Sequence, residues 1–348
     1  MADGQYITFG KLMRGLNKSC KNVRWKTSVT QYELNGLKNT IKLLRDCACD
    51  KYAISPYQVF EIYEPKHRII TATRIRDRQF QRCLCDEYLY KELTRSFIYD
   101  NCACQKNKGT HFAMNRLKTH LQKYYRSNNS ADGYYLKCDI SHFFDSIDHD
   151  VAKTAVRKRV HDCSAVKYVD DIIDSFGGDS GIGLGSQVSQ LIALTVLDDM
   201  DHMIKEKLGV RRYIRYMDDF VLIHDNIDYL RKCLNEISAH LQSIGLSLNS
   251  KTTIQPLKNG ISFLNWRYIL KDSGKVLMIP SQNRVCKKRK KLRKMSRMYL
   301  DGRITHDSFF QTVDGIVAHL EHGSSKRAVT SVIEAANICN HRKDDRND

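Results

Sequence analysis

Apolar residues recur along the chain with two different periods, and the changes of period divide it into segments. Three- and four-residue spacing of Leu and Ile predicts helices over residues 10–50 and over residues 77–126, with a loop at 107–109. Between them, alternating apolar residues predict a hairpin over residues 59–75 that turns at residues 64–67. The first third is therefore expected to be mostly helical.

The middle of the chain has the pattern of strands. Residues 134–140 (YYLKCDI) are aromatic and β-branched, and residues 211–225 (RRYIRYMDDFVLIHD) form two strand-like runs around a polar tip. A Gly-rich segment and then a helix, over residues 177–208, lie between them, and residues 261–279 predict two more strands. From Ser281 onward the pattern is helical again. The predicted class is α+β, with an antiparallel sheet between helical flanks.

Charge adds a hint about partners. The 348 residues include 57 Lys and Arg against 39 Asp and Glu, a net charge of +18 that attracts polyanions, of which nucleic acid is the commonest. No apolar run approaches the roughly 18 residues needed to cross a bilayer, and no secretory signal precedes the first helix. We therefore expect a cytoplasmic protein with no membrane partner.

The 12 cysteines are expected to be reduced and mostly buried. Three pairs have the spacing C-x-C, whereas structural zinc sites usually use C-x2-4-C. Free cysteine otherwise behaves as a small apolar residue. The pairs are Cys47/Cys49, Cys83/Cys85 and Cys102/Cys104.

Carboxylates at the strand ends suggest the chemistry. Asp218 and Asp219 are adjacent at the tip of the second hairpin, and Asp139 ends the strand over residues 134–140. A lone Asp in a turn is usually a solvated loop residue. If the strand pairs beside the hairpin, however, Asp139 and Asp218 can face each other. Three such carboxylates form a hard-oxygen site for two Mg2+ ions, which suits in-line nucleotidyl transfer.

Five segments resemble motifs of the reverse transcriptase family, and they occur in the family's order over nearly the whole chain. YMDD (216–219) looks like the YxDD signature, and LKCDISHFFDSI (136–147) is similar to the first palm motif. The remaining three are LGSQVSQ (184–190), GLSLNSKT (245–252) and FLNW (263–266). LGSQVSQ stands where the family has QGxxxSP. GLSLNSKT stands in the place of the motif that follows the hairpin, and FLNW in the place of the primer grip.

This resemblance implies an RNA-directed DNA polymerase with the right-hand architecture of fingers, palm and thumb. Residues 1–130 would form the fingers, and residues 150–180 would also belong to this subdomain. The palm would be residues 131–280, and a basic helical thumb would be residues 281–348.

The resemblance also implies roles for individual residues. Two Mg2+ ions, for which Mn2+ can substitute, would be held by Asp139, the backbone carbonyl of Ile140, Asp218 and Asp219. Phe144 stands at the steric gate that excludes a 2′-hydroxyl, the alternative being core packing beside Phe143. Lys251 is a candidate general acid, the alternative being an ordinary phosphate-binding or solvated lysine. The implied substrate-binding set is Lys66, Arg68, Arg74, Ile140, Phe144, Leu184, Gly185, Ser189 and Gln190.

One motif departs from the family pattern. Leu184 replaces the Gln of QGxxxSP and Gln190 replaces the Pro, which removes a hydrogen-bonding group near the nascent base pair. Looser discrimination is therefore expected. The pattern resembles the reverse transcriptases of diversity-generating retroelements, and bacterial antiphage-defence reverse transcriptases have the same architecture. The sequence leaves both roles open.

Nine basic residues lie between Arg284 and Arg297. At helical spacing they suit a thumb helix that follows a duplex backbone, the alternative being a solvated charged helix. The candidate nucleic-acid-binding residues are Lys287, Lys288, Arg289, Lys290, Lys291, Arg293 and Lys294.

Two other functions remain as alternatives. One is a catalytically silent RNA-binding scaffold, and the other is a weakly template-dependent DNA polymerase that is active only with a partner protein or RNA. The implied partners of the polymerase are template RNA, the cDNA product and dNTPs, with a structured non-coding RNA and an accessory protein as further candidates.

Overall fold

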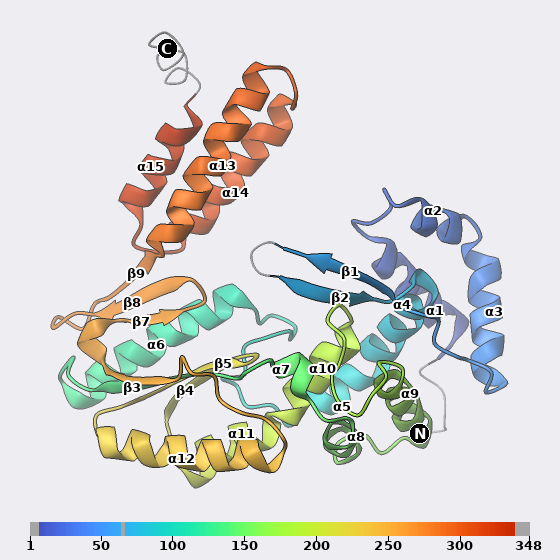
Figure 1. Cartoon of the computed structure of the whole chain (residues 1–348), viewed down its shortest axis with the longest axis horizontal. Helices are drawn as coiled ribbons and strands as arrows, with labels where there is room; N and C mark the ends of the chain where they lie inside the picture. The colour runs from blue at the N-terminus through green and yellow to red at the C-terminus, as the bar shows by residue number, and fades with distance from the viewer. Residues whose placement is uncertain (1–6, 64–66, 338–348) are drawn as a thin grey trace.

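A computed structural model of the chain describes residues 7–63 and 67–337. Helices fill most of its N-terminal region, as the apolar spacing predicts (Figure 1). The first three are α1 (Phe9–Cys20), α2 (Thr27–Leu34) and α3 (Gly36–Ala48). After the first hairpin follow α4 (Ile75–Leu84), the π-helical turn η1 (Cys85–Leu89), α5 (Tyr90–Thr94) and α6 (Thr110–Asn128).

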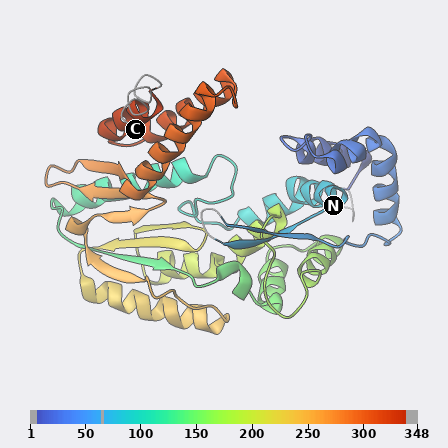
Figure 2. The same ribbon diagram turned by 45° about the horizontal axis from the view of Figure 1, so that its top comes forward.

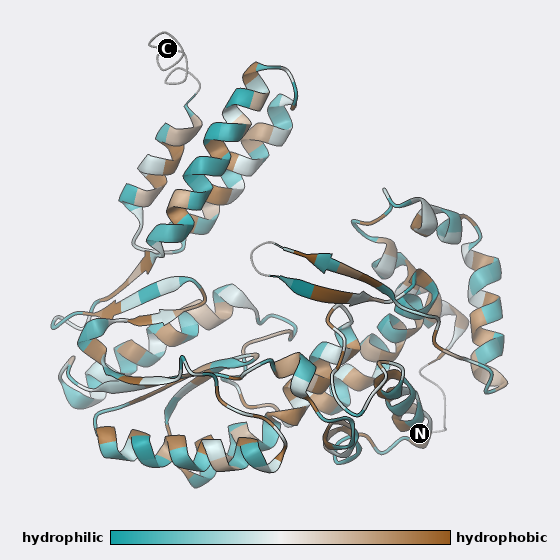
Figure 3. Ribbon diagram, in the orientation of Figure 1, coloured by the Kyte–Doolittle hydropathy of each residue, from teal (hydrophilic) through white to brown (hydrophobic). Residues whose placement is uncertain are grey.

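The predicted first hairpin is present as strands β1 (Gln58–Ile62) and β2 (Arg68–Ala72), which form a separate two-stranded antiparallel sheet. It extends from the N-terminal helices towards the middle of the molecule (Figure 1). Both strands are largely apolar (Figure 3), yet Val59 is 64% and Ile69 55% exposed. Residues 64–66 of its turn, including Lys66, lie outside the described residues.

The loop before α6 is longer than predicted, because residues 95–109 are not helical. Part of this segment hydrogen-bonds to a strand instead of to itself: the Arg215 amide donates to the Asp100 carbonyl (3.1 Å), and the Cys102 amide donates to the Arg215 carbonyl (2.9 Å). The long-range pairing therefore overrides the local helical pattern.

A four-stranded antiparallel sheet forms the centre of the molecule. Its spatial order is β4 (Arg212–Tyr216), β5 (Asp219–His224), β3 (Tyr134–Asp139) and β6 (Thr253–Pro256). The predicted strand and hairpin are confirmed, and β6 is an additional strand.

Both faces of this sheet are buried. Leu136 and Cys138 of β3 lie in one apolar cluster with Ile237 of helix α12 (Ile227–Ser243). Tyr135, whose side chain points the opposite way, lies in a second cluster with Leu121 of α6. This alternation explains why the strands are apolar at nearly every position.

Shorter helices connect the strands. Between β3 and β4 lie α7 (Phe143–Ser146), α8 (His149–Arg157), α9 (Cys163–Asp174), α10 (Gln187–Val196), α11 (Asp198–His202) and the π-helical turn η2 (Met203–Lys207). The helix predicted from residue 188 to 208 is thus divided after Val196. Of the 11 cysteines that the structure describes, six are buried, including Cys83, Cys85 and Cys102.

A second sheet contains three strands where two were predicted. They are β7 (Ile261–Phe263), β8 (Trp266–Leu270) and β9 (Val276–Pro280), preceded by the short helix η3 (Leu257–Asn259). The additional turn is at Leu264 and Asn265, which both have positive φ (50° and 67°). Leucine seldom adopts this conformation, so the local sequence does not indicate a turn there.

The chain ends in a bundle of α13 (Gln282–Leu300), α14 (His306–Glu321) and α15 (Lys326–Ala336), as the helical pattern predicts. The bundle has its own core, which includes Leu292, Phe309 and Leu320. Two views place it beyond the second sheet, at a distance from the N-terminal helices (Figures 1 and 2). No helix in residues 7–63 or 67–337 is long and apolar enough to cross a membrane.

Gly323, between α14 and α15, provides a test of how the bundle packs on the second sheet. A Cβ at this position would lie 2.1 Å from Cζ3 of Trp266 and 2.7 Å from the Met278 carbonyl oxygen. We expect Gly323→Ala to lower the free energy of unfolding by about 1–3 kcal/mol, because the buried indole and the backbone have to shift. Urea unfolding followed by Trp266 fluorescence, in a Trp25→Phe background, measures this change.

The matched control is Gly315→Ala within α14, where an added Cβ meets nothing within 4 Å. This substitution should instead stabilise the helix by about 0.5–1 kcal/mol. A Gly323→Ala variant as stable as the wild type would contradict the close packing.

Candidate active site

Strand register brings the predicted carboxylates to one end of the central sheet. In the β3–β5 pair, Asp139 lies directly opposite Asp219. Asp218 precedes Asp219 in the turn, and its carbonyl accepts a hydrogen bond from the amide of Ile140 (3.3 Å). Asp139 is distant in the chain from the consecutive Asp218 and Asp219, and the antiparallel pairing of the two strands makes it their neighbour.

Asp219 shows the electrostatic cost of this arrangement. Burial raises the pKa of its carboxyl to about 7, and repulsion from Asp139 and Asp218 adds to the effect of burial. The opposing cation is Lys137, whose Nζ lies 3.6 Å from Oδ1 of Asp219. Lys137 was not among the predicted site residues, although it precedes Asp139 by two positions and therefore points to the same side of β3.

These residues fit a divalent cation. Oδ1 of Asp219 is buried and accepts no hydrogen bond, and carboxylate oxygens are the ligands that Mg2+ prefers. Within the described part of the chain, however, no three Asp, Glu, His or Cys side chains are close enough to enclose an ion as they stand. Completing a metal site would therefore require further ligands, or a shift of the carboxylates.

An open cleft of about 1250 Å³ lies over the carboxylates. Asp139, Asp218 and Asp219 line it, together with four other predicted residues: Arg68, Phe144, Leu184 and Gln190. The turn at residues 264–265 and the start of α13 line it as well, so every sheet and the C-terminal bundle contribute to its wall.

The two adjacent phenylalanines have different environments. Both residues border the cleft, but Phe143 is only 3% exposed and belongs to the main apolar core, whereas Phe144 is half-buried. Their rings meet edge to face, with centroids 5.5 Å apart. Phe144 is thus supported from behind by a core residue while its ring borders the space beside the acids.

The segment over residues 184–190 joins the first hairpin to the cleft. The Thr71 amide of β2 donates to the Leu184 carbonyl (3.2 Å), and a Cβ at Gly185 would lie 3.3 Å from the Thr71 carbonyl oxygen. Gly185 also has a φ of +129°, which favours glycine. Ser189, fully buried in the first turn of α10, has an Oγ that makes no hydrogen bond.

Several predicted site residues are not among the described residues that line the cleft: Arg74, Ile140, Gly185, Ser189 and the candidate general acid Lys251. Lys66 lies outside the described residues. Arg74 donates from Nε to the Pro56 carbonyl (3.1 Å), and Lys251 is exposed. Lys251 nevertheless belongs to a turn beside the acids, because the Asn249 amide donates to the Asp139 carbonyl (2.7 Å).

Helix α13 is largely hydrophilic (Figure 3) and begins at the cleft, which Gln282 lines. Val285, Leu292 and Ser296 form its buried face. Five of the seven predicted basic residues are exposed, and Lys288 and Arg289 are half-buried. The exposed ones are Lys287, Lys290, Lys291, Arg293 and Lys294.

A protein-family model described as "Reverse transcriptase (RNA-dependent DNA polymerase)" matches residues 64–267, more than half of the chain. The chain therefore belongs to the reverse transcriptase family, a class of RNA-directed DNA polymerases whose domains generally use divalent metal ions. A comparison with curated proteins found no match.

Solved telomerase structures resemble the chain. Telomerase from Candida albicans, in complex with the TWJ fragment of telomeric RNA, has a TM-score of 0.51 at 10% identity, covering 87% of this chain and 61% of that one. Apo telomerase from Candida tropicalis gives 0.48 at 15% identity, covering 62% and 47%. The chain thus spans about half to three fifths of the length of these proteins. The first likeness supports the predicted α+β polymerase fold.

Phe144 provides a test of the cleft. If Phe144 is the steric gate that the family resemblance implies, Phe144→Ala should reduce the preference for dNTPs over rNTPs by about 10- to 100-fold, because the ring would no longer exclude the 2′-hydroxyl. Comparing kcat/KM for the two nucleotide classes measures this preference. Phe143→Leu is the control, which should cost stability but keep the preference; a folded Phe144→Ala variant with unchanged preference would exclude the gate.

Proposed function

We propose that the protein is an RNA-directed DNA polymerase that synthesises cDNA with two Mg2+ ions bound by Asp139, Asp218 and Asp219. The observation that carries this proposal is the β3–β5 register, which sets Asp139 opposite Asp219 at the wall of a large open cleft. Oδ1 of Asp219 is buried, accepts no hydrogen bond and lies 3.6 Å from Lys137 Nζ, which supports a metal ion as a closer cationic partner.

Each predicted site residue has a proposed task in this reaction. When bound, the Mg2+ ions would lower the pKa of the attacking 3′-hydroxyl and neutralise the leaving pyrophosphate. Arg68, with Lys66 on the same hairpin, would bind the triphosphate. Phe144 would lie under the sugar of the incoming dNTP, while Leu184 and Gln190 would border the nascent base pair. Gly185, Ser189 and Arg74 would support this site, the Ile140 carbonyl would be a further metal ligand, and Lys251 would protonate the pyrophosphate.

We assign the fingers to residues 1–130 and 150–180, the palm to residues 131–280 and the thumb to residues 281–348. The separate hairpin sheet, the central sheet and the three-helix bundle with its own core support this division. In this arrangement the cleft lies where the three parts meet, because Arg68, Asp218 and Gln282 all line it.

The biological role that we favour is cDNA synthesis on a dedicated RNA, in a bacterial diversity-generating retroelement or an antiphage-defence system. The aliphatic Leu184 in the cleft wall supports loose base discrimination, which suits diversification. Template RNA, cDNA and dNTPs are the proposed partners, with a structured non-coding RNA and an accessory protein as further ones, in the cytoplasm.

Two other functions are alternatives to this proposal. One is a weakly template-dependent DNA polymerase that is active only with a partner protein or RNA, and the other is a catalytically silent RNA-binding scaffold.

Primer extension tests the proposal directly. Wild-type protein should extend a DNA primer on an RNA template in Mg2+ or Mn2+, and EDTA should abolish the reaction. Asp218→Asn should reduce the rate at least about 1000-fold, because a neutral amide binds and neutralises the metal poorly. Asp225→Asn, an exposed carboxylate at the other end of β5, is the control and should keep the rate.

Sequencing of co-purified RNA and of the cDNA separates the alternatives. Misincorporation opposite adenine would favour diversification. Equal inactivity of the wild type and Asp218→Asn with a specific RNA bound, even after the partner is added, would contradict the polymerase and favour the scaffold.

The basic helix should contribute to duplex binding by neutralising phosphates. Replacing Lys287, Lys290, Lys291 and Lys294 with Gln should weaken binding uniformly across sequences. The slope of log K against log salt concentration should also fall by about one for each phosphate that is no longer neutralised. Titration of a labelled RNA–DNA duplex at several salt concentrations measures both effects. Replacing Lys38 and Lys42 of α3 is the control; equal effects in both variants would exclude a specific role for α13.

A further inference from the structure

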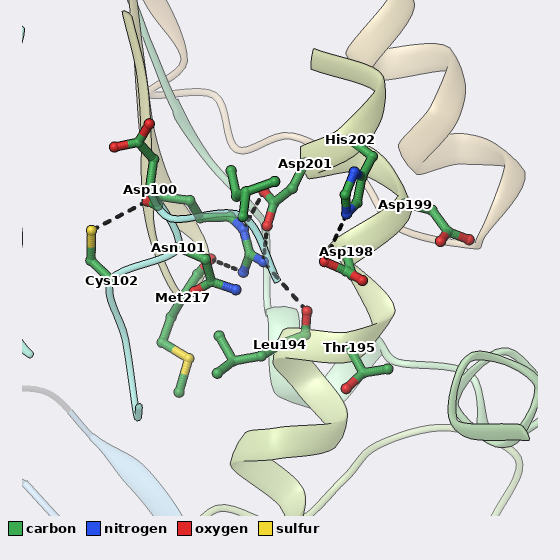
Figure 4. Close-up of polar contacts among 12 residues, drawn as sticks. Asp100, Asn101, Cys102, Leu194, Thr195, Asp198, Asp199, Asp201, His202 and Met217 are labelled. Atoms are coloured by element: carbon green, nitrogen blue, oxygen red, sulfur yellow. Dashed lines mark hydrogen bonds and ion pairs between the residues drawn. The ribbon is translucent and has the colours of Figure 1, made fainter. Parts of the chain in front are cut away.

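Arg215 of β4 directly precedes the YMDD turn and is fully buried. Its ion-pair partner, Asp201 of helix α11, is fully buried as well. Its guanidinium donates from Nε to Oδ1 (2.7 Å) and from Nη2 to Oδ2 (2.5 Å) of that carboxylate (Figure 4). Tyr213 of the same strand donates from its hydroxyl to Oδ1 as well (2.6 Å). This two-pronged contact fixes the plane and the position of the guanidinium.

The same guanidinium also contacts the turn of the β4–β5 hairpin. Its Nη1 donates to the carbonyl of Met217 (3.1 Å), and Nη2 also contacts the Leu194 carbonyl of α10 (3.4 Å; Figure 4). Met217 has a φ of +56°, in the left-handed region that residues other than glycine seldom occupy. The strained residue between Tyr216 and Asp218 is thus bound to a buried charge.

The backbone of Arg215 is held from the other side. It pairs with Asp100 and Cys102 through the two hydrogen bonds that break the predicted helix there. Asp100 is in turn bound by Lys205 Nζ (2.7 Å), by His120 Nε2 (3.0 Å) and by Arg116. Arg215 is therefore anchored by both its main chain and its side chain before it contacts the turn.

Stability alone is a weak reason for this arrangement. A buried ion pair seldom stabilises a fold more than apolar residues of similar volume do, because both charges lose their hydration. An apolar side chain at this position could not donate a hydrogen bond to the Met217 carbonyl. The contact to the turn is thus the property that requires an arginine.

We propose that Arg215, held by Asp201, is a positioning residue that keeps Met217 in the left-handed conformation and thereby directs Asp218 and Asp219 into the cleft. This inference rests on the proposed polymerase function. It assigns Arg215 no contact with the substrate, and Asp201 acts only through Arg215.

The first test is Arg215→Lys, which keeps the charge but lacks the planar fork that donates to both Asp201 oxygens and to the Met217 carbonyl from three nitrogens. We expect kcat for primer extension to fall about 10-fold or more, since small displacements of reacting groups are costly. The KM for dNTP should stay within about twofold, because the nucleotide-binding side chains are untouched. The Mg2+ concentration for half-maximal rate should rise, which a loss of stability alone would not cause.

The matched control is Arg159→Lys. Arg159, whose side chain is 11% exposed, pairs with the buried Asp198, with Nη2 2.8 Å from Oδ2, but none of the residues to which it hydrogen-bonds belongs to the YMDD turn. Compared at equal folded fraction, this variant should retain the wild-type kcat and Mg2+ dependence. Equal losses in both variants would overturn the positioning role.

The second test is rescue. Met217→Gly removes the steric cost of the left-handed turn, so it should recover part of the kcat lost in Arg215→Lys when the two are combined. A double-mutant cycle measures this coupling, and strictly additive effects would overturn the proposal. If Arg215→Lys does not fold, Asp201→Asn replaces it in the cycle, with the same criterion.

Hydrogen exchange separates this inference from the proposed function. Arg215→Lys should speed amide exchange at residues 216–219 and at Ile140, whose amide binds the Asp218 carbonyl, whether or not the protein is active. An inactive wild type with this change in exchange would refute the polymerase but leave the positioning role in place. Unchanged exchange there would refute the positioning role alone.

Discussion

The pairing of β3 with β5 sets two carboxylates, Asp139 and Asp219, directly across from each other at the end of the central sheet. Like charges in this position destabilise a sheet, and burial raises the pKa of Asp219 to about 7. Lys137 offsets only part of this cost at 3.6 Å. The proposed binding of metal ions by these acids gives a physical reason for this costly arrangement, and several surrounding elements hold the acids in place.

Those supports come from segments far apart in the chain. On one side, the Asn249 amide binds the Asp139 carbonyl; on the other, Arg215 binds the carbonyl of Met217 within the turn. The Gly-rich segment joins the first hairpin to the cleft through Thr71 and Leu184. Phe144 and Arg68, which we propose contact the substrate, line the same cleft as the acids.

Much of this could be predicted from local patterns. Alternation of apolar residues indicated both hairpins, helical spacing indicated the C-terminal bundle, and the YMDD motif located the acids. Other features depend on contacts that local sequence does not encode. Residues 95–109 pair with β4 rather than forming a helix, and the turn at Leu264 and Asn265 uses a conformation that leucine seldom adopts. The partner of Arg215 lies 14 residues away on another element, and the strand contains a second arginine, Arg212, so the local sequence did not single out Arg215.

The most direct test of the account is to locate metal ions in a complex of the protein with an RNA template, a chain-terminated DNA primer and the next dNTP. Anomalous diffraction from crystals grown with Mn2+ would reveal the ions independently of activity. The account predicts two peaks, roughly 3.5–4 Å apart, in contact with Asp139 and Asp218 beside the triphosphate. A nucleotide bound in the cleft with no peak at either carboxylate would contradict it.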